Sequence, residues 1–92
     1  MAAATLIKMP KRFDYSSGVQ FNAQITAALD VAGVITLDCE QLEYIDSAGI
    51  GLLVMAQKKS QSRQSTLTIV NLKSVPKEIL QLANLQKIIE IR

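Results

Sequence analysis

Residues 46–51 read Asp-Ser-Ala-Gly-Ile-Gly and stand between two apolar stretches, Val-Ile-Thr-Leu at 34–37 and Leu-Leu-Val-Met-Ala at 52–56. This order predicts a buried strand, a loop, a serine and then a buried helix that begins at about Ser47. Serine favours the N-cap of a helix because its oxygen can accept a backbone N–H that the first turn leaves unpaired. The positive end of the helix dipole also favours a bound or covalent anion there. Ser47 is therefore either a helix cap or an acceptor of an anionic group.

Three more residues of this stretch bear on a binding role. Gly49 and Gly51 fall in the first turn, where each glycine costs about 1 kcal/mol against alanine, so we expect something to come close to this backbone. Ile50 lies beside the serine. If Ile50 points outward it offers an apolar contact to a docking protein, and if it points inward it belongs to the core.

Length and composition predict one domain over residues 1–92. Apolar residues form 49% of the chain, but only two Phe and two Tyr are present, so the core should consist mostly of Ile, Leu, Val and Ala. The net charge of +2 is small. No basic stripe interleaved with aromatic residues occurs, so nucleic acid is not an expected partner.

Several kinds of chemistry lack the residues they need. The chain has no histidine, the commonest general base and metal ligand. A single cysteine, Cys39, excludes an internal disulfide and a zinc cluster and is interpreted as a small residue at a strand end. No apolar run reaches the roughly 18 residues of a membrane span, and the N-terminus lacks the pattern of a signal peptide. We therefore expect a cytoplasmic, non-catalytic protein with no membrane insertion and no cofactor.

Hydrophobic patterning predicts an α/β fold: one domain with a four- to five-stranded, mostly parallel or mixed sheet and three main helices packed on it. Residues 11–15 are open to interpretation as a short strand or a loop. The expected strands are 5–9, 34–39, 66–71 and 87–91, and the expected helices are 19–29, 47–60 and 74–83.

The expected first helix has an apolar face, and Gly33 should end it in a left-handed turn. That face consists of Phe21, Ile25, Ala28, Leu29 and Ala32. For the third helix, Ser74 is the expected N-cap, Pro76 falls in the first turn, and Asn84 is the expected left-handed C-cap. Its expected buried stripe is Val75, Ile79, Leu82 and Ala83.

The remaining polar residues have plainer interpretations. The basic run at 58–64 is typical of a solvated helix end, and Ser60, Ser62 and Ser65 are expected in a polar loop setting. Asp38 and Asp46 both flank the central motif, and paired carboxylates can do acid–base work or hold a metal. Because no third ligand accompanies them, we expect no metal site.

The order Leu37-Asp38, followed by Tyr-Ile-Asp-Ser-Ala-Gly-Ile-Gly-Leu-Leu at 44–53, resembles the core motif of the STAS domain family. It is most similar to the small stand-alone anti-sigma-factor antagonists of bacteria. The resemblance implies that Ser47 is the residue that a partner kinase phosphorylates. Ala48 stands where many relatives have Ser or Thr, which leaves one hydroxyl in the motif. The resemblance also suggests that Asp14 faces a partner, although a turn residue is an equally good interpretation.

By this resemblance the chain works by partner switching. Its unphosphorylated form would bind an anti-sigma factor that is a serine kinase with a histidine-kinase-like ATPase fold, and so release that kinase's target. Phosphorylation would break the complex, and a metal-dependent serine phosphatase would restore it. The implied partner-binding residues are Asp14, Asp46, Ser47, Ala48, Gly49, Ile50 and Gly51. The alternative is a non-catalytic STAS subunit of a transporter, such as a phospholipid ABC system, or of a stress-signalling complex.

Overall fold

The structure is a computed structural model that describes residues 4–31 and 33–92. Four parallel strands form the main sheet in the order β1-β3-β5-β6, and two short strands form a separate parallel pair, β2-β4. The main strands are β1 (Ala4–Lys8), β3 (Val34–Asp38), β5 (Thr66–Val70) and β6 (Glu90–Ile91), and the short pair is β2 (Arg12–Phe13) and β4 (Tyr44–Ile45). The expected α/β class is confirmed.

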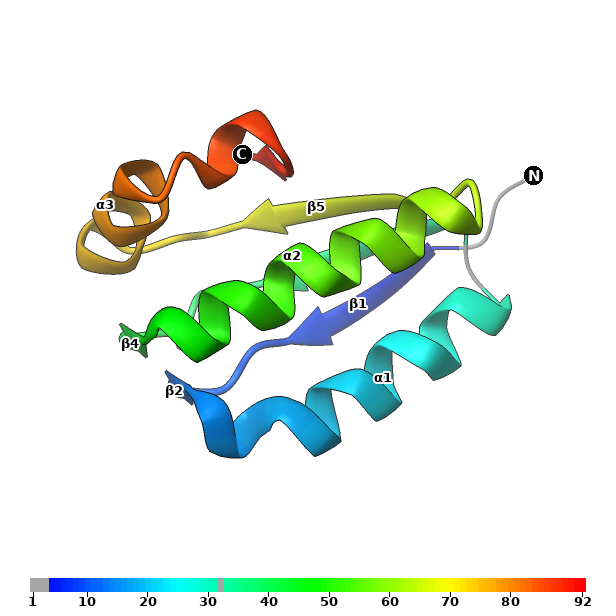
Figure 1. Cartoon of the computed structure of the whole chain (residues 1–92), viewed down its shortest axis with the longest axis horizontal. Helices are drawn as coiled ribbons and strands as arrows, with labels where there is room; N and C mark the ends of the chain where they lie inside the picture. Colours follow the sequence, from blue (N-terminus) through cyan, green and yellow to red (C-terminus); the bar gives the residue numbers. More distant parts are fainter. Residues whose placement is uncertain (1–3, 32) are drawn as a thin grey trace.

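In the described residues three α-helices connect the strands. One short 3-10 segment precedes the first helix, and another follows the third. The helices are α1 (Gly18–Val31), α2 (Ser47–Ser62) and α3 (Ser74–Leu82), and the 3-10 segments are η1 (Tyr15–Ser17) and η2 (Leu85–Lys87). The main strands follow one another across the sheet in chain order, so right-handed crossovers all fall on the same face. Figure 1 shows α1 and α2 side by side over one face, with α3 set apart beyond the end of β5. α3 also contacts β4.

The core lies between that face of the sheet and the two long helices. Alternate strand residues point into it because successive side chains of a strand face opposite sides. Phe13 and Phe21 meet edge to face, with ring centroids 4.9 Å apart, and join the short strand pair to α1. The sheet contributes Ile7, Ile35, Leu37, Leu67 and Ile69, and the helices contribute Phe21, Ile25, Leu29, Leu53 and Ala56.

The first helix agrees with its expected face, since Phe21, Ile25, Ala28 and Leu29 are all buried. Ala32, the fifth residue of that face, lies outside the described residues, and the left-handed turn expected at Gly33 stays a prediction. Asn84 has φ 59°, a left-handed conformation that its short amide side chain tolerates, as the sequence predicts.

The third helix corrects two expectations. Its N-cap is Lys73, which makes no side-chain capping bond, and Ser74 is already the first helical residue. Its buried residues are Pro76 and Leu80, whereas Val75 and Leu82 are 59% and 79% exposed. The predicted stripe is therefore off by about a quarter turn, although Ile79, one of its residues, is half-buried and packs against the core. The face that packs is set by the neighbouring segments around β4 and η2 and not by the apolar residues of α3 alone.

The polar end of α2 also differs from its expected loop setting. The helix continues to Ser62, so Ser60 and Ser62 are both helical. Ser60 is fully buried, and its hydroxyl donates to the carbonyl oxygen of Ala56 at 2.9 Å. That bond satisfies the hydroxyl inside the core, which is why a polar side chain is tolerated there.

Candidate functional site

The motif at 46–51 forms the junction between β4 and α2. Asp46 has an extended backbone, and its carboxylate accepts the N–H of Gly49 at 2.8 Å. This is an N-cap, because it satisfies one donor that the first turn leaves free. The helix begins at Ser47, as predicted, but the prediction that Ser47 itself could be the cap is wrong. Its exposed hydroxyl is not used to start the helix.

The two glycines of the motif turn out to differ. A Cβ at Gly49 would lie 2.5 Å from the carbonyl oxygen of Phe13, so the expected close approach is made by the backbone that follows β2. A Cβ at Gly51 would meet nothing within 4 Å. Gly49 therefore fixes how α2 sits on the short strand pair, and Gly51 lies on the open surface.

The side chains exposed around Ser47 are small. Ala48 and Gly51 are exposed, and Ile50 is half-buried and packs against the core. Ile50, whose orientation the sequence left open, therefore belongs mainly to the core. What α2 presents beside the serine is a surface of small side chains that a partner could approach closely.

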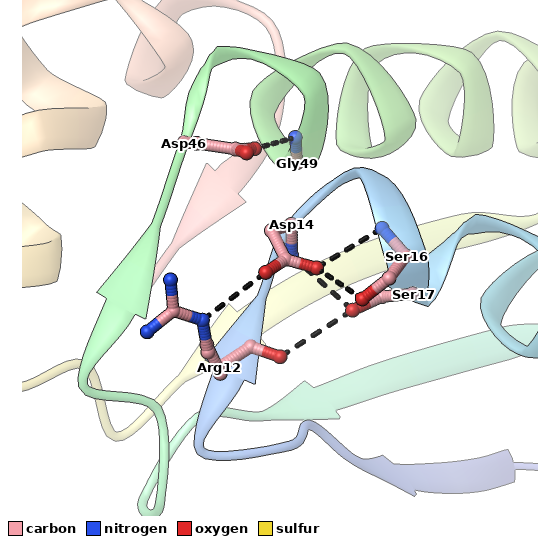
Figure 2. A network of polar contacts seen from close by, with 6 residues as sticks. All are labelled: Arg12, Asp14, Ser16, Ser17, Asp46 and Gly49. Carbon is pink, nitrogen blue, oxygen red and sulfur yellow. Dashed lines mark hydrogen bonds and ion pairs between the residues drawn. The ribbon is translucent and has the colours of Figure 1, made fainter.

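Asp14 follows β2 as Asp46 follows β4, and it too caps a helical segment. Its carboxylate accepts the N–H of Ser16 at 3.0 Å, and its own backbone N–H donates to Ser17 Oγ at 3.2 Å (Figure 2). Hydrogen bonds from Ser16, followed by Arg12, hold the pKa of Asp14 below its usual value. The structure supports the turn-residue interpretation of Asp14, and its partner-facing role stays a prediction.

The short strands bring two further residues to this site that the sequence reading did not single out. In the parallel register Arg12 lies opposite Tyr44 and Phe13 opposite Ile45. Arg12 Nε bonds Asp14 Oδ2 at 3.1 Å, and its guanidinium carbon lies 4.4 Å from the centre of the Tyr44 ring. A sequence signal for this pairing exists, because residues 12–14 and 44–46 both carry a buried apolar residue followed by aspartate.

The remaining candidates have structural partners. Asp38 Oδ1 accepts bonds from Asn71 Nδ2 at 3.0 Å and the Glu40 N–H at 3.1 Å, and these bonds lower its pKa. Cys39 is buried at the end of β3, and burial raises the pKa of its thiol to about 12. Across 4–31 and 33–92, no group of three His, Cys, Asp or Glu side chains could hold a metal ion. In the same residues, no helix is both long and apolar enough to cross a bilayer.

The fold and the site define a small α/β domain whose second long helix begins with an exposed serine. A sequence model of the family described as "Mlab, STAS domain" matches residues 3–90. The chain therefore belongs to the STAS domain family.

The chain is also similar in sequence to proteins from two Listeria species. The anti-sigma-B factor antagonists of Listeria monocytogenes and Listeria innocua are each 34% identical to this chain over 59 residues. The match covers 64% of this chain and 52% of each relative, so it spans about half the length of the curated relatives.

Solved structures share the fold. The anti-sigma factor antagonist SpoIIAA in its unphosphorylated form matches with a TM-score of 0.72 and 19% identity, over 96% of this chain and 78% of that chain. The phosphorylated form of this Bacillus protein matches with a TM-score of 0.71 and 20% identity, over 96% of this chain and 82% of that chain. A sulfate transporter family protein from Wolinella succinogenes has a TM-score of 0.82 at 13% identity, over 91% and 69%. These structures show the shared architecture alone.

Proposed function

We propose that this chain, as a single STAS domain, is an anti-sigma-factor antagonist switched by phosphorylation of Ser47. The observation that carries the proposal is the exposed hydroxyl of Ser47, the first residue of a 16-residue helix whose capping is done by Asp46. A hydroxyl without a structural duty can be modified without loss of the fold. The names of the Listeria relatives support the antagonist role.

The unphosphorylated protein would bind an anti-sigma factor that is also a serine kinase with a histidine-kinase-like ATPase fold. That kinase would transfer the γ-phosphoryl group of ATP to Ser47 Oγ and leave ADP. The product carries a charge of about −1.5 to −2 beside Asp46, which opposes burial in an interface. The N–H groups at the start of α2 stabilise the same charge in the free protein. A metal-dependent serine phosphatase would return the protein to its binding form.

The surface to be covered consists of Ser47, Ala48 and Gly51, with Ile50 fixed beneath it. Asp14 and Asp46 lie at the edge of this surface, at the ends of β2 and β4. Gly49 contributes through its contact with Phe13 and not through exposure. The proposed activity is binding in the cytoplasm, with no reaction catalysed by this chain and no cofactor.

The decisive experiment measures binding to the purified cognate anti-sigma factor. Ser47→Ala should bind as the unmodified protein does and resist phosphorylation. Ser47→Asp should bind more weakly, and the phosphorylated protein should bind most weakly, because phosphate has more charge and more acceptor oxygens than a carboxylate. Ser62→Ala, an exposed serine at the other end of α2, is the matched control and should behave as the unmodified protein.

Equal binding by all forms, with circular dichroism showing intact folds, would refute the switch. Co-purification then distinguishes the alternative, a STAS subunit of a transporter or stress-signalling complex. The names of the Listeria relatives favour the antagonist over that alternative. Capture of a transporter ATPase in place of a kinase-like ATPase would establish the transporter role.

A further inference from the structure

The outer face of the β2-β4 pair carries a compact set of charged and aromatic side chains. Phe13 and Ile45 point into the core, so the residues on either side of each, Arg12 with Asp14 and Tyr44 with Asp46, belong to the opposite face. The register places Arg12 beside Tyr44 and Phe13 beside Ile45, and Asp14 and Asp46 are the residues that follow these two strands. Figure 2 shows Arg12 bonded to Asp14, with Asp46 at the end of the neighbouring strand bonded to Gly49.

Arg12 is the cation of this set. Its side chain is 69% exposed, and its bond to Asp14 uses only Nε. Within the described residues its two terminal nitrogens have no hydrogen-bond acceptor. Arg12 and Tyr44 also line an open surface hollow of about 220 Å³, which gives the guanidinium room to move. The neighbouring cation, Lys11, is instead paired with Glu43 at 3.4 Å.

We propose that Arg12 is the counter-ion of the phosphate on Ser47 and that it leaves Asp14 when the phosphate is added; this inference rests on the proposed function of Ser47. A phosphate carries about −1.5 to −2 charge and accepts two parallel N–H bonds from a guanidinium, so it competes well with the single bond to Asp14. Asp14 and Asp46 already place two carboxylates here. A third anionic group therefore needs the guanidinium close by.

The distances permit this exchange. Tyr44 lies one strand spacing, about 4.8 Å, from Arg12, and Ser47 follows three residues later, at most about 10 Å along the chain. A long arginine side chain and a phosphoserine can bridge that gap from its two ends. Stacking on Tyr44 already holds the guanidinium over β4, which ends two residues before the serine.

The exchange would transmit the effect of phosphorylation from the start of α2 to the segment before α1. Asp14 holds η1 by accepting the Ser16 N–H, and Arg12 is one of its supports. Loss of Arg12 leaves Asp14 facing a nearby phosphate without its cation. The exposed side chains of Tyr15 and Val19, which follow Asp14, are then presented on a less firmly held segment.

The test uses protein with phosphoserine inserted at position 47 during translation, so that no kinase is needed, and follows the phosphate by ³¹P NMR titration. A nearby guanidinium favours the dianion and lowers the second pKa of the phosphate. Arg12→Gln should therefore raise that pKa by about 0.5 unit or more, less than the shifts of buried pairs because Arg12 is exposed. Arg12→Lys should restore part of the shift.

Lys11→Gln is the matched control. It removes a positive charge from the residue next to Arg12, and Lys11 is already paired with Glu43. It should move the phosphate pKa by much less. In addition, the Nε–H signal of Arg12 should shift when phosphoserine replaces Ser47. Equal pKa changes in the two variants, or an unmoved Nε–H signal, would overturn the proposal. If the cognate kinase does not modify Ser47, the proposed function is refuted. The result of the titration is not affected, because it needs no kinase.

Discussion

At the scale of single residues, Gly49 shows how a sequence position can be fixed by a distant backbone. It lies in the first turn of α2, where alanine is intrinsically favoured by about 1 kcal/mol. The carbonyl oxygen of Phe13 occupies the place that a Cβ would need, and Ile45 lies on another side at 2.9 Å. Packing therefore outweighs helix propensity at this position.

The first prediction compares the two glycines of the motif. Gly49→Ala should destabilise the protein by about 1–3 kcal/mol, because the contact is with backbone that cannot move aside cheaply. Gly51→Ala should stabilise it by about 0.5–1 kcal/mol, because that position is helical and open. Urea unfolding of both variants measures the difference, and effects of the same sign would contradict the described packing of α2.

Asp46 and Ser47 show where residue chemistry alone stops. Both residue types are good N-caps, so the sequence could not assign the cap between neighbours. The hydrogen bond to Gly49 assigns it to Asp46. A free serine hydroxyl and a capping aspartate side by side are what the proposed switch needs, because the fold then does not depend on the group that is modified.

At the scale of elements, α2 has one buried face flanked by half-buried residues, and its remaining side is exposed. Leu53 is 2% exposed, and Met55, two residues later, is 53% exposed. The apolar residues of this helix, considered without its neighbours, suggest burial nearly all round. Only one side meets the sheet and α1.

The second prediction tests this face. Leu53→Ala should cost about 2–5 kcal/mol, since it removes a buried side chain and leaves a cavity. Met55→Ala, the control on the exposed face, should change stability by no more than about 0.5 kcal/mol. Chemical unfolding gives both values, and a loss below about 0.5 kcal/mol for Leu53→Ala would mean that α2 packs through another face.

At the scale of the whole molecule, Asp38 connects the carboxyl ends of neighbouring strands. It ends β3, lies opposite Lys8 of β1 in the register, and accepts a bond from Asn71, which follows β5. The Asn71 bond, then the Glu40 N–H, lowers the pKa of Asp38 below the ordinary 3.8. The pKa of Asp14 is lowered as well, first by Ser16 and then by Arg12.

The third prediction concerns acid. Because both carboxyl groups have a lower pKa folded than unfolded, the unfolded chain takes up protons first as the pH falls. Their stabilising effect is complete above the ordinary value of 3.8 and is lost as the pH drops through the folded values. Urea midpoints measured between about pH 5 and pH 2 should therefore fall. Asp38→Asn and Asn71→Ala should each reduce that fall, and an unchanged slope in both would contradict the Asp38 bonds.

Local patterning in the sequence predicted the α/β class, a strand at 34–39 that the structure has at 34–38, the apolar face of α1, the start of α2 and the left-handed Asn84. These depend on local patterning, or on a conformation that the residue itself favours. Tertiary structure decided which face of α3 is buried, that Gly49 faces Phe13, and that Arg12 contacts both Tyr44 and Asp14. Two-residue strands such as β2 and β4 carry almost no periodic signal, so their pairing depends on contacts between segments some 30 residues apart.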